Sequence, residues 1–154
     1  MEIRTLSAVL SFAEKLEGQG AEFYEDLSNQ EKFSENRNFF SDFAKGNRKH
    51  KQQVKRAYQE SITDAFETGG SFNLEPSDYL VSTAMSGGLG QPAIIKKAIE
   101  LEEKMGKFYL DAGDQSKSLL ADISRTFKLI AKKKSERQNK LRYLYQENKG
   151  GLDD

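Results

Sequence analysis

The sequence predicts an all-α protein, a four-helix bundle of two helical hairpins joined by a long crossover that contains a short extra helix. Apolar residues recur at intervals of three and four along four long stretches of the chain. No stretch alternates polar and apolar residues for long enough to form a strand, and the 154 residues include only 2 prolines. About 30 residues separate the second stretch from the third, and bundles with one such long connection are known.

The first two helices are expected over residues 6–28 and 35–60. Gly18 and Gly20 interrupt the first helix, and each costs about 1 kcal/mol relative to alanine, so we expect a packing reason for them. The two helices present apolar stripes made of Leu6, Val9, Leu10, Ala13, Leu16, Phe23, Tyr24 and Leu27 in the first and Phe39, Phe40, Phe43, Ala44, Val54, Ala57 and Tyr58 in the second.

The second pair of helices is expected over residues 92–114 and 117–147. Before it, residues 61–91 contain two glycine-rich points, at 69–70 and 87–90, and Pro76 can open a short helix through Met85. We expect residues 1–147 to form one domain. The polar residues 148–154, which include Gly150 and Gly151, are expected to form a flexible C-terminal tail.

Composition excludes several classes of function. Lys and Arg number 24, as do Asp and Glu, so the formal net charge is zero and nucleic acid is not an expected partner. The absence of cysteine excludes disulfides, thiol nucleophiles and Cys-ligated iron sites. No apolar run approaches the roughly 20 residues that span a bilayer, and the first ten residues do not resemble a signal peptide. We therefore expect a cytoplasmic protein with no membrane partner.

The sequence contains an internal repeat. Two motifs match at an offset of 85 residues, namely Ala13-x-x-Leu16-Glu17 with Phe23-Tyr24 and Ala98-x-x-Leu101-Glu102 with Phe108-Tyr109. The second and fourth helices match less closely, at an offset of 87 residues, through Phe43-Ala44 and Ile130-Ala131. The simple interpretation is two similar hairpins related by a pseudo-twofold axis.

Each predicted helix carries polar residues in the middle of its apolar stripe. Because these stripes should face the core, the polar residues should meet in one layer inside the bundle. The hydroxyls of Tyr24 and Tyr109 are expected to bond to this layer. If the helical register were shifted, the two glutamates would instead face solvent. The residues are Glu17 in the first helix, Asn47 and His50 in the second, Glu102 in the third, and Lys134 and Arg137 in the fourth.

These patterns are similar to those of a known family. A single Glu on each of two helices, with Glu-x-x-His on each of the other two, holds two metal ions in ferritin-like carboxylate bundles. The chain resembles the rubrerythrin branch of that superfamily through the repeated Ala-x-x-x-Glu-x5-Phe-Tyr pattern and through Phe43-Ala44 followed by His50. The resemblance implies a ferritin-like fold, a di-iron site, and an iron-dependent oxidoreductase.

The metal ligands of the family carry over only in part. Three ligand positions remain, at Glu17, His50 and Glu102, and three are substituted: Asn47 and Lys134 stand where the family has Glu, and Arg137 stands where it has His. Lys and Arg do not bind metals at neutral pH. The negative charges of Glu17 and Glu102 and the positive charges of Lys134 and Arg137 also cancel one another without any metal ion. We therefore expect a degenerate di-iron site with no catalytic residue and no cofactor, in which an internal salt-bridge cluster replaces the metals.

Several functions remain open at this stage. The protein is expected to be a non-catalytic structural or interaction protein, with a homodimer as one possibility. The main alternative is a metal-binding oxidoreductase of the rubrerythrin type, for iron oxidation or peroxide reduction, that uses a reduced site. Glu17, His50 and Glu102 form a legitimate set for iron or another single divalent metal, if Lys134 and Arg137 turn away. Metal storage in an oligomeric shell is a third hypothesis.

Basic residues concentrate in two of the predicted helices. The second has seven Lys or Arg against three Asp or Glu and the fourth has nine against three, whereas the first has one against five. Charge complementarity between neighbouring helices and solvated outer faces explains this distribution. The alternative is a basic patch for an acidic partner or nucleic acid, made of Lys45, Arg48, Lys49, Lys51, Lys132, Lys133 and Lys140.

Overall fold

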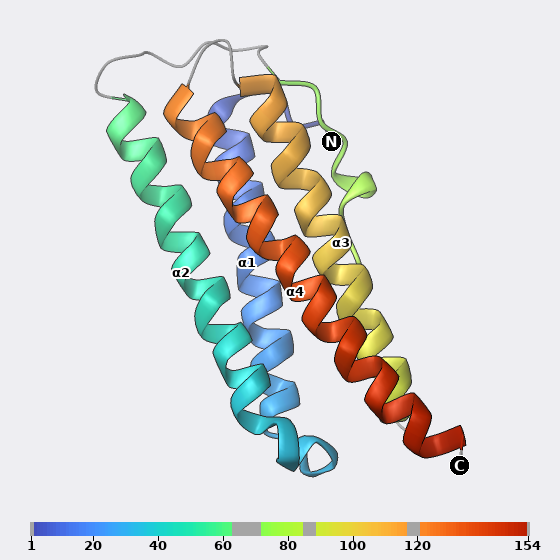
Figure 1. The fold of residues 1–154 in the computed structure, drawn as a ribbon. Coiled ribbons are helices and arrows are strands. Elements are labelled where there is room, and N and C mark those ends of the chain that lie inside the picture. Colours follow the sequence, from blue (N-terminus) through green and yellow to red (C-terminus); the bar gives the residue numbers. More distant parts are fainter. Residues whose placement is uncertain (1, 63–71, 85–88, 117–120, 154) are drawn as a thin grey trace.

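The structure is a computed structural model that describes residues 2–62, 72–84, 89–116 and 121–153 (Figure 1). These residues form four α-helices and two short 3-10 turns, so the prediction of an all-α, four-helix protein is confirmed. In the described part of the chain the only strand-like pairing is one isolated bridge between Ile3 and Leu74. The elements in chain order are α1 (Leu6–Ser28), η1 (Glu31–Asn36), α2 (Arg37–Ile62), η2 (Pro76–Asp78), α3 (Gln91–Ser116) and α4 (Ala121–Asp153).

The helices form two antiparallel hairpins, α1 with α2 and α3 with α4, and α2 runs in the same direction as α3 (Figure 1). The end of α2 and the start of α3 therefore lie at opposite ends of the bundle. At one end, the backbone N–H of Ile3 donates to the carbonyl of Leu74 at 2.8 Å, and the backbone N–H of Asn73 donates to Gln115 Oε1 at 2.7 Å. At the other end, Lys32 Nζ donates to the carbonyl of Leu89 at 2.9 Å.

Aromatic packing holds the crossover against α1 and α3. The ring of Tyr79 lies 6.3 Å from that of Phe12 and 5.4 Å from that of Phe108, between centroids. The Tyr79 hydroxyl donates to Asp111 Oδ2 at 2.7 Å. Burying three aromatic rings in this way stabilises the crossover and fixes α1 beside α3, which carry the two glutamates of the predicted polar layer.

The start of α1 follows the ordinary chemistry of helix capping. The side chain of Thr5 accepts a hydrogen bond from the backbone N–H of Ala8 at 3.1 Å, which satisfies one of the unpaired donors of the first turn. Within the helix, Gly20 has the packing reason that we expected, because a Cβ there would collide with the carboxamide of Asn47. A Cβ at Gly18 would meet no neighbouring atom within 4 Å, so close packing does not explain this glycine.

Three boundaries differ from the sequence prediction. The second helix begins at Arg37, because the 3-10 turn η1 occupies the preceding residues. The short extra helix is a single turn, Pro76–Asp78; Met85, where we expected it to end, lies outside the described residues. We expected residues 148–154 to form a flexible tail. The fourth helix instead continues through Asp153, so the backbone of residues 148–153 is helical. No proline interrupts this segment, and glycine weakens a helix without stopping it.

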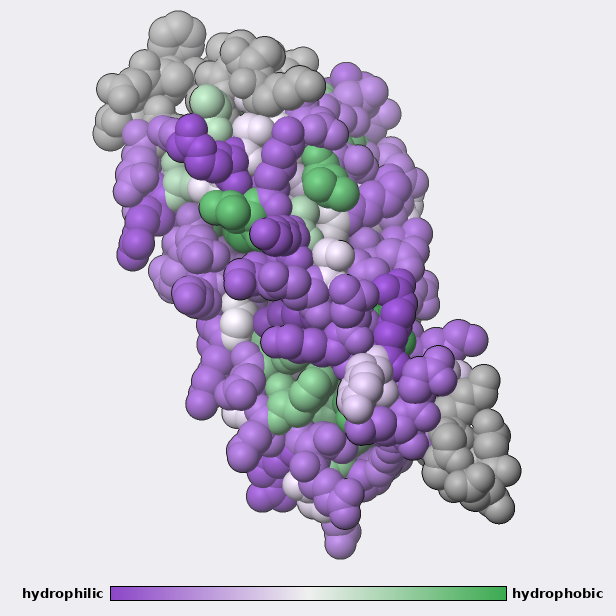
Figure 2. All heavy atoms as spheres, in the orientation of Figure 1, coloured by the Kyte–Doolittle hydropathy of each residue, from purple (hydrophilic) through white to green (hydrophobic). Residues whose placement is uncertain are grey.

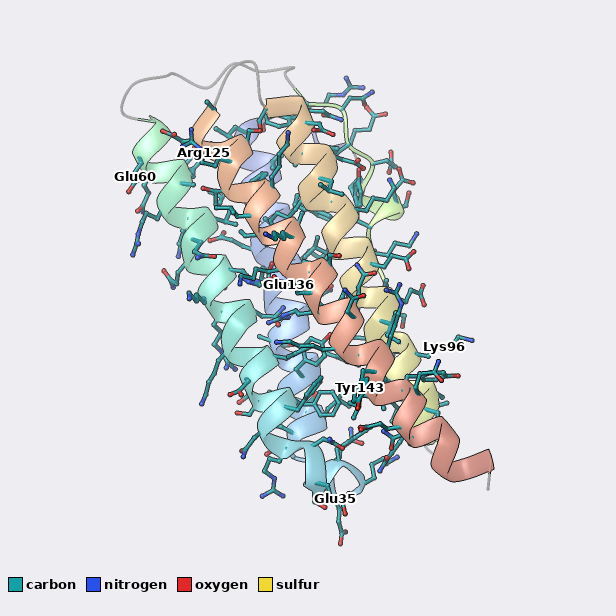
Figure 3. The ribbon with its side chains drawn as sticks, in the orientation of Figure 1. Glu35, Glu60, Lys96, Arg125, Glu136 and Tyr143 are labelled. Atoms are coloured by element: carbon teal, nitrogen blue, oxygen red, sulfur yellow. The ribbon has the colours of Figure 1, made fainter. Side chains whose placement is uncertain are left out.

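The predicted glycine turns at 69–70 and 87–88 and the start of the fourth helix at Lys117 also lie outside the described residues. The visible surface is mostly hydrophilic (Figure 2), and charged side chains stand out along the outer faces of the helices (Figure 3). Among the described helices, none combines the length and the apolarity that crossing a lipid bilayer requires.

Candidate functional site

The six polar residues predicted to face inward do so, and they meet in one layer inside the bundle. Each of the six side chains is at most 8% exposed. Charged side chains are almost never fully buried in proteins unless they are paired. The layer therefore has to satisfy its own charges and hydrogen bonds. Its members are Glu17 on α1, Asn47 and His50 on α2, Glu102 on α3, and Lys134 and Arg137 on α4.

Two basic side chains from α4 neutralise the two acids of the layer. The ammonium of Lys134 lies 3.0 Å from Glu17 Oε1 and 3.7 Å from Glu102 Oε1, and all three side chains have no exposed surface. The guanidinium of Arg137 lies 3.4 Å from Glu102 Oε2 through Nη1. The layer thus holds two negative and two positive charges, and Lys134 bridges the carboxylates of α1 and α3.

The carboxamide of Asn47 links Glu17 to Arg137. Its Nδ2 donates to Glu17 Oε1 at 2.9 Å, and its Oδ1 accepts from Arg137 Nη1 at 2.7 Å. An amide can do both because it carries a donor and an acceptor, whereas an ionised carboxylate could only accept. Asn47 therefore suits a position where one side chain must donate a hydrogen bond to Glu17 and accept one from Arg137.

Arg137 reaches the layer through a space that a glycine leaves open. Its Nη2 donates to the carbonyl of Phe43 at 2.6 Å, and its guanidinium lies 4.5 Å from the centroid of the Phe43 ring. A Cβ at Gly46 would collide with the same guanidinium. The hydrogen bond and the cation–π contact stabilise the buried cation beyond its pairing with Glu102.

Two tyrosines bond to the layer across the hairpins, as the sequence predicts. The hydroxyl of Tyr24 on α1 donates to Glu102 Oε2 on α3 at 2.6 Å, and the hydroxyl of Tyr109 on α3 donates to Glu17 Oε2 on α1 at 2.7 Å. Both tyrosines and both glutamates are related by the 85-residue offset of the sequence repeat. The two reciprocal bonds therefore obey a pseudo-twofold relation between the hairpins.

The electrostatics of the layer keep Glu17 ionised and the two tyrosines protonated. Burial by itself would raise the pKa of Glu17, but the ammonium of Lys134, with smaller contributions from His50 and Tyr109, outweighs burial and lowers this pKa to about 2. Burial and the neighbouring carboxylate, Glu102 or Glu17, raise the pKa of Tyr24 and Tyr109 well above their ordinary value. Each phenol thus remains a hydrogen-bond donor at neutral pH.

His50 belongs to the layer, but its Nδ1 lies just beyond hydrogen-bonding distance of the nearest acid. Its Nδ1 lies 3.6 Å from Glu17 Oε1, and neither this nitrogen nor Glu102 Oε1 has a hydrogen-bond partner among the described residues. Burial lowers the pKa of His50 below its ordinary value and, together with the nearby cations Lys134 and Arg137, outweighs the Glu17 carboxylate, which acts in the opposite direction. The imidazole is therefore neutral at physiological pH.

The residues of the layer do not fit a metal centre in this arrangement. In the described part of the chain, no three His, Cys, Asp or Glu side chains are grouped so that they could hold a metal ion. The Lys134 ammonium stands between the two carboxylates that a metal would have to share. A divalent cation there would be repelled by several kcal/mol, even at an effective dielectric constant of about 20. This arrangement also disfavours a single ion on Glu17, His50 and Glu102.

Sequence reasoning found the polar residues of the layer but missed the small residue that admits Arg137. The available signal was a glycine in the interior of a helix, one turn before His50, since such a glycine often marks a close approach. The carbonyl of Phe43, which binds Arg137, has no sequence signal because every residue has a carbonyl group.

We compared the chain with models of protein families, with curated proteins and with solved structures, and it matches none of them. The fold and the geometry of the polar layer are therefore the basis on which a function can be proposed.

Proposed function

We propose that the protein is a ferritin-like bundle of the rubrerythrin type whose di-iron site has degenerated, and that it acts as a non-catalytic structural or interaction protein. The observation that carries this proposal is the fully buried ammonium of Lys134, which lies within ion-pairing distance of both Glu17 and Glu102. In the ferritin-like arrangement, glutamates on those two helices share the metal ions. A side-chain cation here takes the electrostatic role of the metal.

The direction of the helices supports the ferritin-like assignment. A crossover that runs the length of the bundle joins two hairpins, and the inward polar residues follow the chain order of the ferritin-like ligand set. A single position lies on each of α1 and α3, and a pair spaced by three lies on each of α2 and α4. The hydrogen bonds from Tyr24 to Glu102 and from Tyr109 to Glu17 are equivalent in the two hairpins, as a pseudo-twofold arrangement of similar hairpins requires.

The chemistry of the layer favours a non-catalytic role. Each carboxylate accepts hydrogen bonds and pairs with a base, so neither is free to bind a metal. Both tyrosines are held protonated. Buried ion pairs often contribute little net stability but can fix a unique packing. We propose that the layer sets the register of the four helices in this protein.

Metal analysis with an activity assay tests the proposed function. Protein purified without chelator is expected to contain well below one ion of iron, manganese or zinc per chain. After addition of ferrous iron it is expected to show no peroxide turnover above that of iron alone. A stoichiometric metal with turnover would instead establish a rubrerythrin-type oxidoreductase. Many ions per chain without turnover would establish metal storage.

A further inference from the structure

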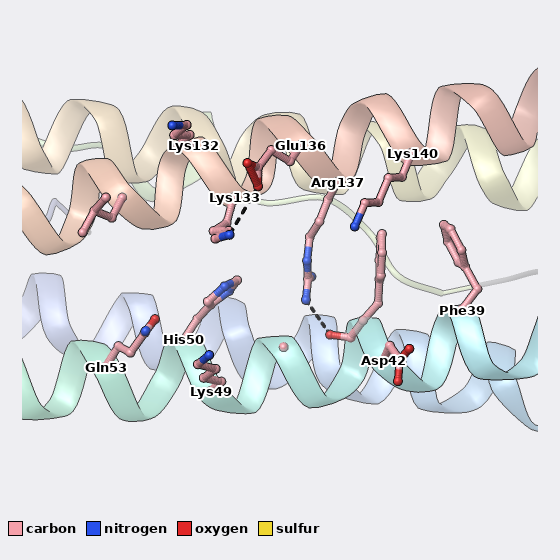
Figure 4. A pocket seen from close by; sticks show the side chains of 13 residues that line it. Phe39, Asp42, Lys49, His50, Gln53, Lys132, Lys133, Glu136, Arg137 and Lys140 are labelled. Carbon is pink, nitrogen blue, oxygen red and sulfur yellow. Dashed lines mark hydrogen bonds and ion pairs between the residues drawn. The ribbon is translucent and has the colours of Figure 1, made fainter.

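A groove opens between α2 and α4 on the solvent side of the polar layer (Figure 4). Its volume is about 580 Å³, and it extends from Phe39 to Gln53 along α2 and from Leu129 to Lys140 along α4. At 1.5 Å per residue, this stretch of α2 corresponds to a length of roughly 20 Å. Arg137 from α4 and His50 from α2 extend between the helices and form its floor.

Basic side chains dominate the walls of this groove. Four exposed lysines line it against two acids, Asp42 and Glu136. Lys133 pairs with Glu136 at 3.5 Å, but in the part of the chain that the structure describes the other three lysines have no ion pair. The exposed walls of the groove thus carry more positive than negative charge, four lysines against two acids. The four lysines are Lys49, Lys132, Lys133 and Lys140, all members of the basic patch that the sequence indicated as an alternative.

Apolar side chains lie toward the two ends of the groove. Leu129 is 60% exposed, which is high for a large apolar residue, and Phe39 is partly buried at the other end. Apolar patches interrupt the hydrophilic surface on this face of the molecule (Figure 2). An occupant of matching chemistry would therefore be negatively charged in its middle and apolar toward both ends.

We propose that the groove between α2 and α4 binds an acidic segment of a partner protein that has a large apolar side chain near each end. The basic walls provide charge complementarity, which favours fast and specific association. The length of the groove suits about four turns of a helix laid along it. A small phosphorylated compound would leave both apolar ends unused. This proposal deepens the interaction role proposed above and rests on it.

Peptide binding tests the groove directly. The probe is a fluorescent helical peptide of about 14 residues with a leucine near each end and glutamates between them. We expect saturable binding in fluorescence anisotropy that weakens at least tenfold from low salt to about 0.5 M salt, because the attraction is between exposed charges. The same peptide with lysine in place of glutamate is expected not to bind.

Paired charge reversals locate the site on the protein. The double variant Lys132→Glu/Lys140→Glu is expected to weaken peptide binding at least tenfold. The control Lys15→Glu/Lys96→Glu changes the net charge equally at exposed positions outside the groove, on α1 and α3, and should bind like the parent protein. Figure 3 labels Lys96 on α3. Circular dichroism verifies that both variants fold.

Three results would overturn the groove proposal. They are absence of peptide binding, equal loss of binding in the two double variants, and tighter binding of a single-stranded DNA oligonucleotide than of the acidic peptide. Failure here can be told from failure of the proposed function. If the purified protein contains no metal but does not bind the peptide, only the groove proposal is refuted. If the purified protein contains stoichiometric metal, the proposed function is refuted, whether or not the peptide binds.

Discussion

Replacing Lys134 with methionine is expected to lower the free energy of unfolding by about 3–5 kcal/mol. Methionine preserves much of the side-chain volume but removes the ammonium that lies between Glu17 and Glu102. Glu17 would keep its neutral hydrogen-bond donors, and Glu102 would keep Arg137. The cluster would nevertheless carry an uncompensated negative charge in the core. Denaturant unfolding monitored by circular dichroism measures the change.

The adjacent substitution Lys133→Met is the matched control. Lys133 is exposed, and its pairing with Glu136 is of the kind that contributes at most about 1 kcal/mol. The two variants differ only in which of two neighbouring lysines is lost. Equal stabilities of the Lys134 and Lys133 variants would contradict the description of Lys134 as the buried counter-ion.

The difference in the free energy of unfolding between the parent protein and the Lys134→Met variant is expected to become smaller as the pH falls. In the parent protein the pKa of Glu17 is lowered to about 2 from an ordinary 4.5, so its stabilising effect is complete above pH 4.5 and is lost as the pH falls toward 2. Without the ammonium, burial raises the pKa of this carboxyl. Protonation of Glu17 then removes the uncompensated negative charge from the core and restores part of the stability of the variant. Unfolding at pH 7 and pH 4 should therefore show a smaller difference at the lower pH. A gap that is constant with pH would argue against a lost charge pair.

Placing the full ligand set of ferritin-like bundles in the polar layer is expected to create metal binding. The triple variant Asn47→Glu/Lys134→Glu/Arg137→His would carry four glutamates and two histidines in the layer. Without metal it should be less stable than the parent, because the acids have lost their basic partners. With ferrous iron it should bind about two ions per chain and regain stability, by about 4 kcal/mol at a free metal concentration a thousand times the dissociation constant. Metal analysis and thermal unfolding with and without iron measure both effects.

A variant that removes the bases without adding acids separates ligand chemistry from the loss of positive charge. Lys134→Gln/Arg137→His leaves Glu17 and Glu102 as the only carboxylates of the layer. It is expected to bind iron far more weakly than the triple variant. If the triple variant folds but takes up no metal, these six positions do not form one site.

The sequence was sufficient to predict the four helices and the inward direction of the polar residues. Both follow from local patterns, since the spacing of apolar residues specifies which face of a helix is buried. Glu17, Asn47 and Lys134 each interrupt such a stripe, so their burial could be predicted one helix at a time. The repeat in addition predicted that the two hairpins are alike.

The partners within the layer could be predicted less well, because they depend on how the helices pack. Tyr24 bonds to Glu102 on the other hairpin and not to Glu17 on its own helix, a choice that no local pattern determines. Asn47, which reads from the sequence as a lost ligand, is in the structure the link between Glu17 and Arg137. The groove depends on the relative placement of α2 and α4, which are far apart in the sequence.

X-ray diffraction from crystals grown with ferrous iron, with data collected at the iron absorption edge, tests most directly whether side chains have replaced the metals. We expect no anomalous peak in the polar layer, with Lys134 Nζ lying between the carboxylates of Glu17 and Glu102. Two anomalous peaks between the helices, with Lys134 and Arg137 turned away from both glutamates, would contradict the internal neutralisation proposed for this bundle.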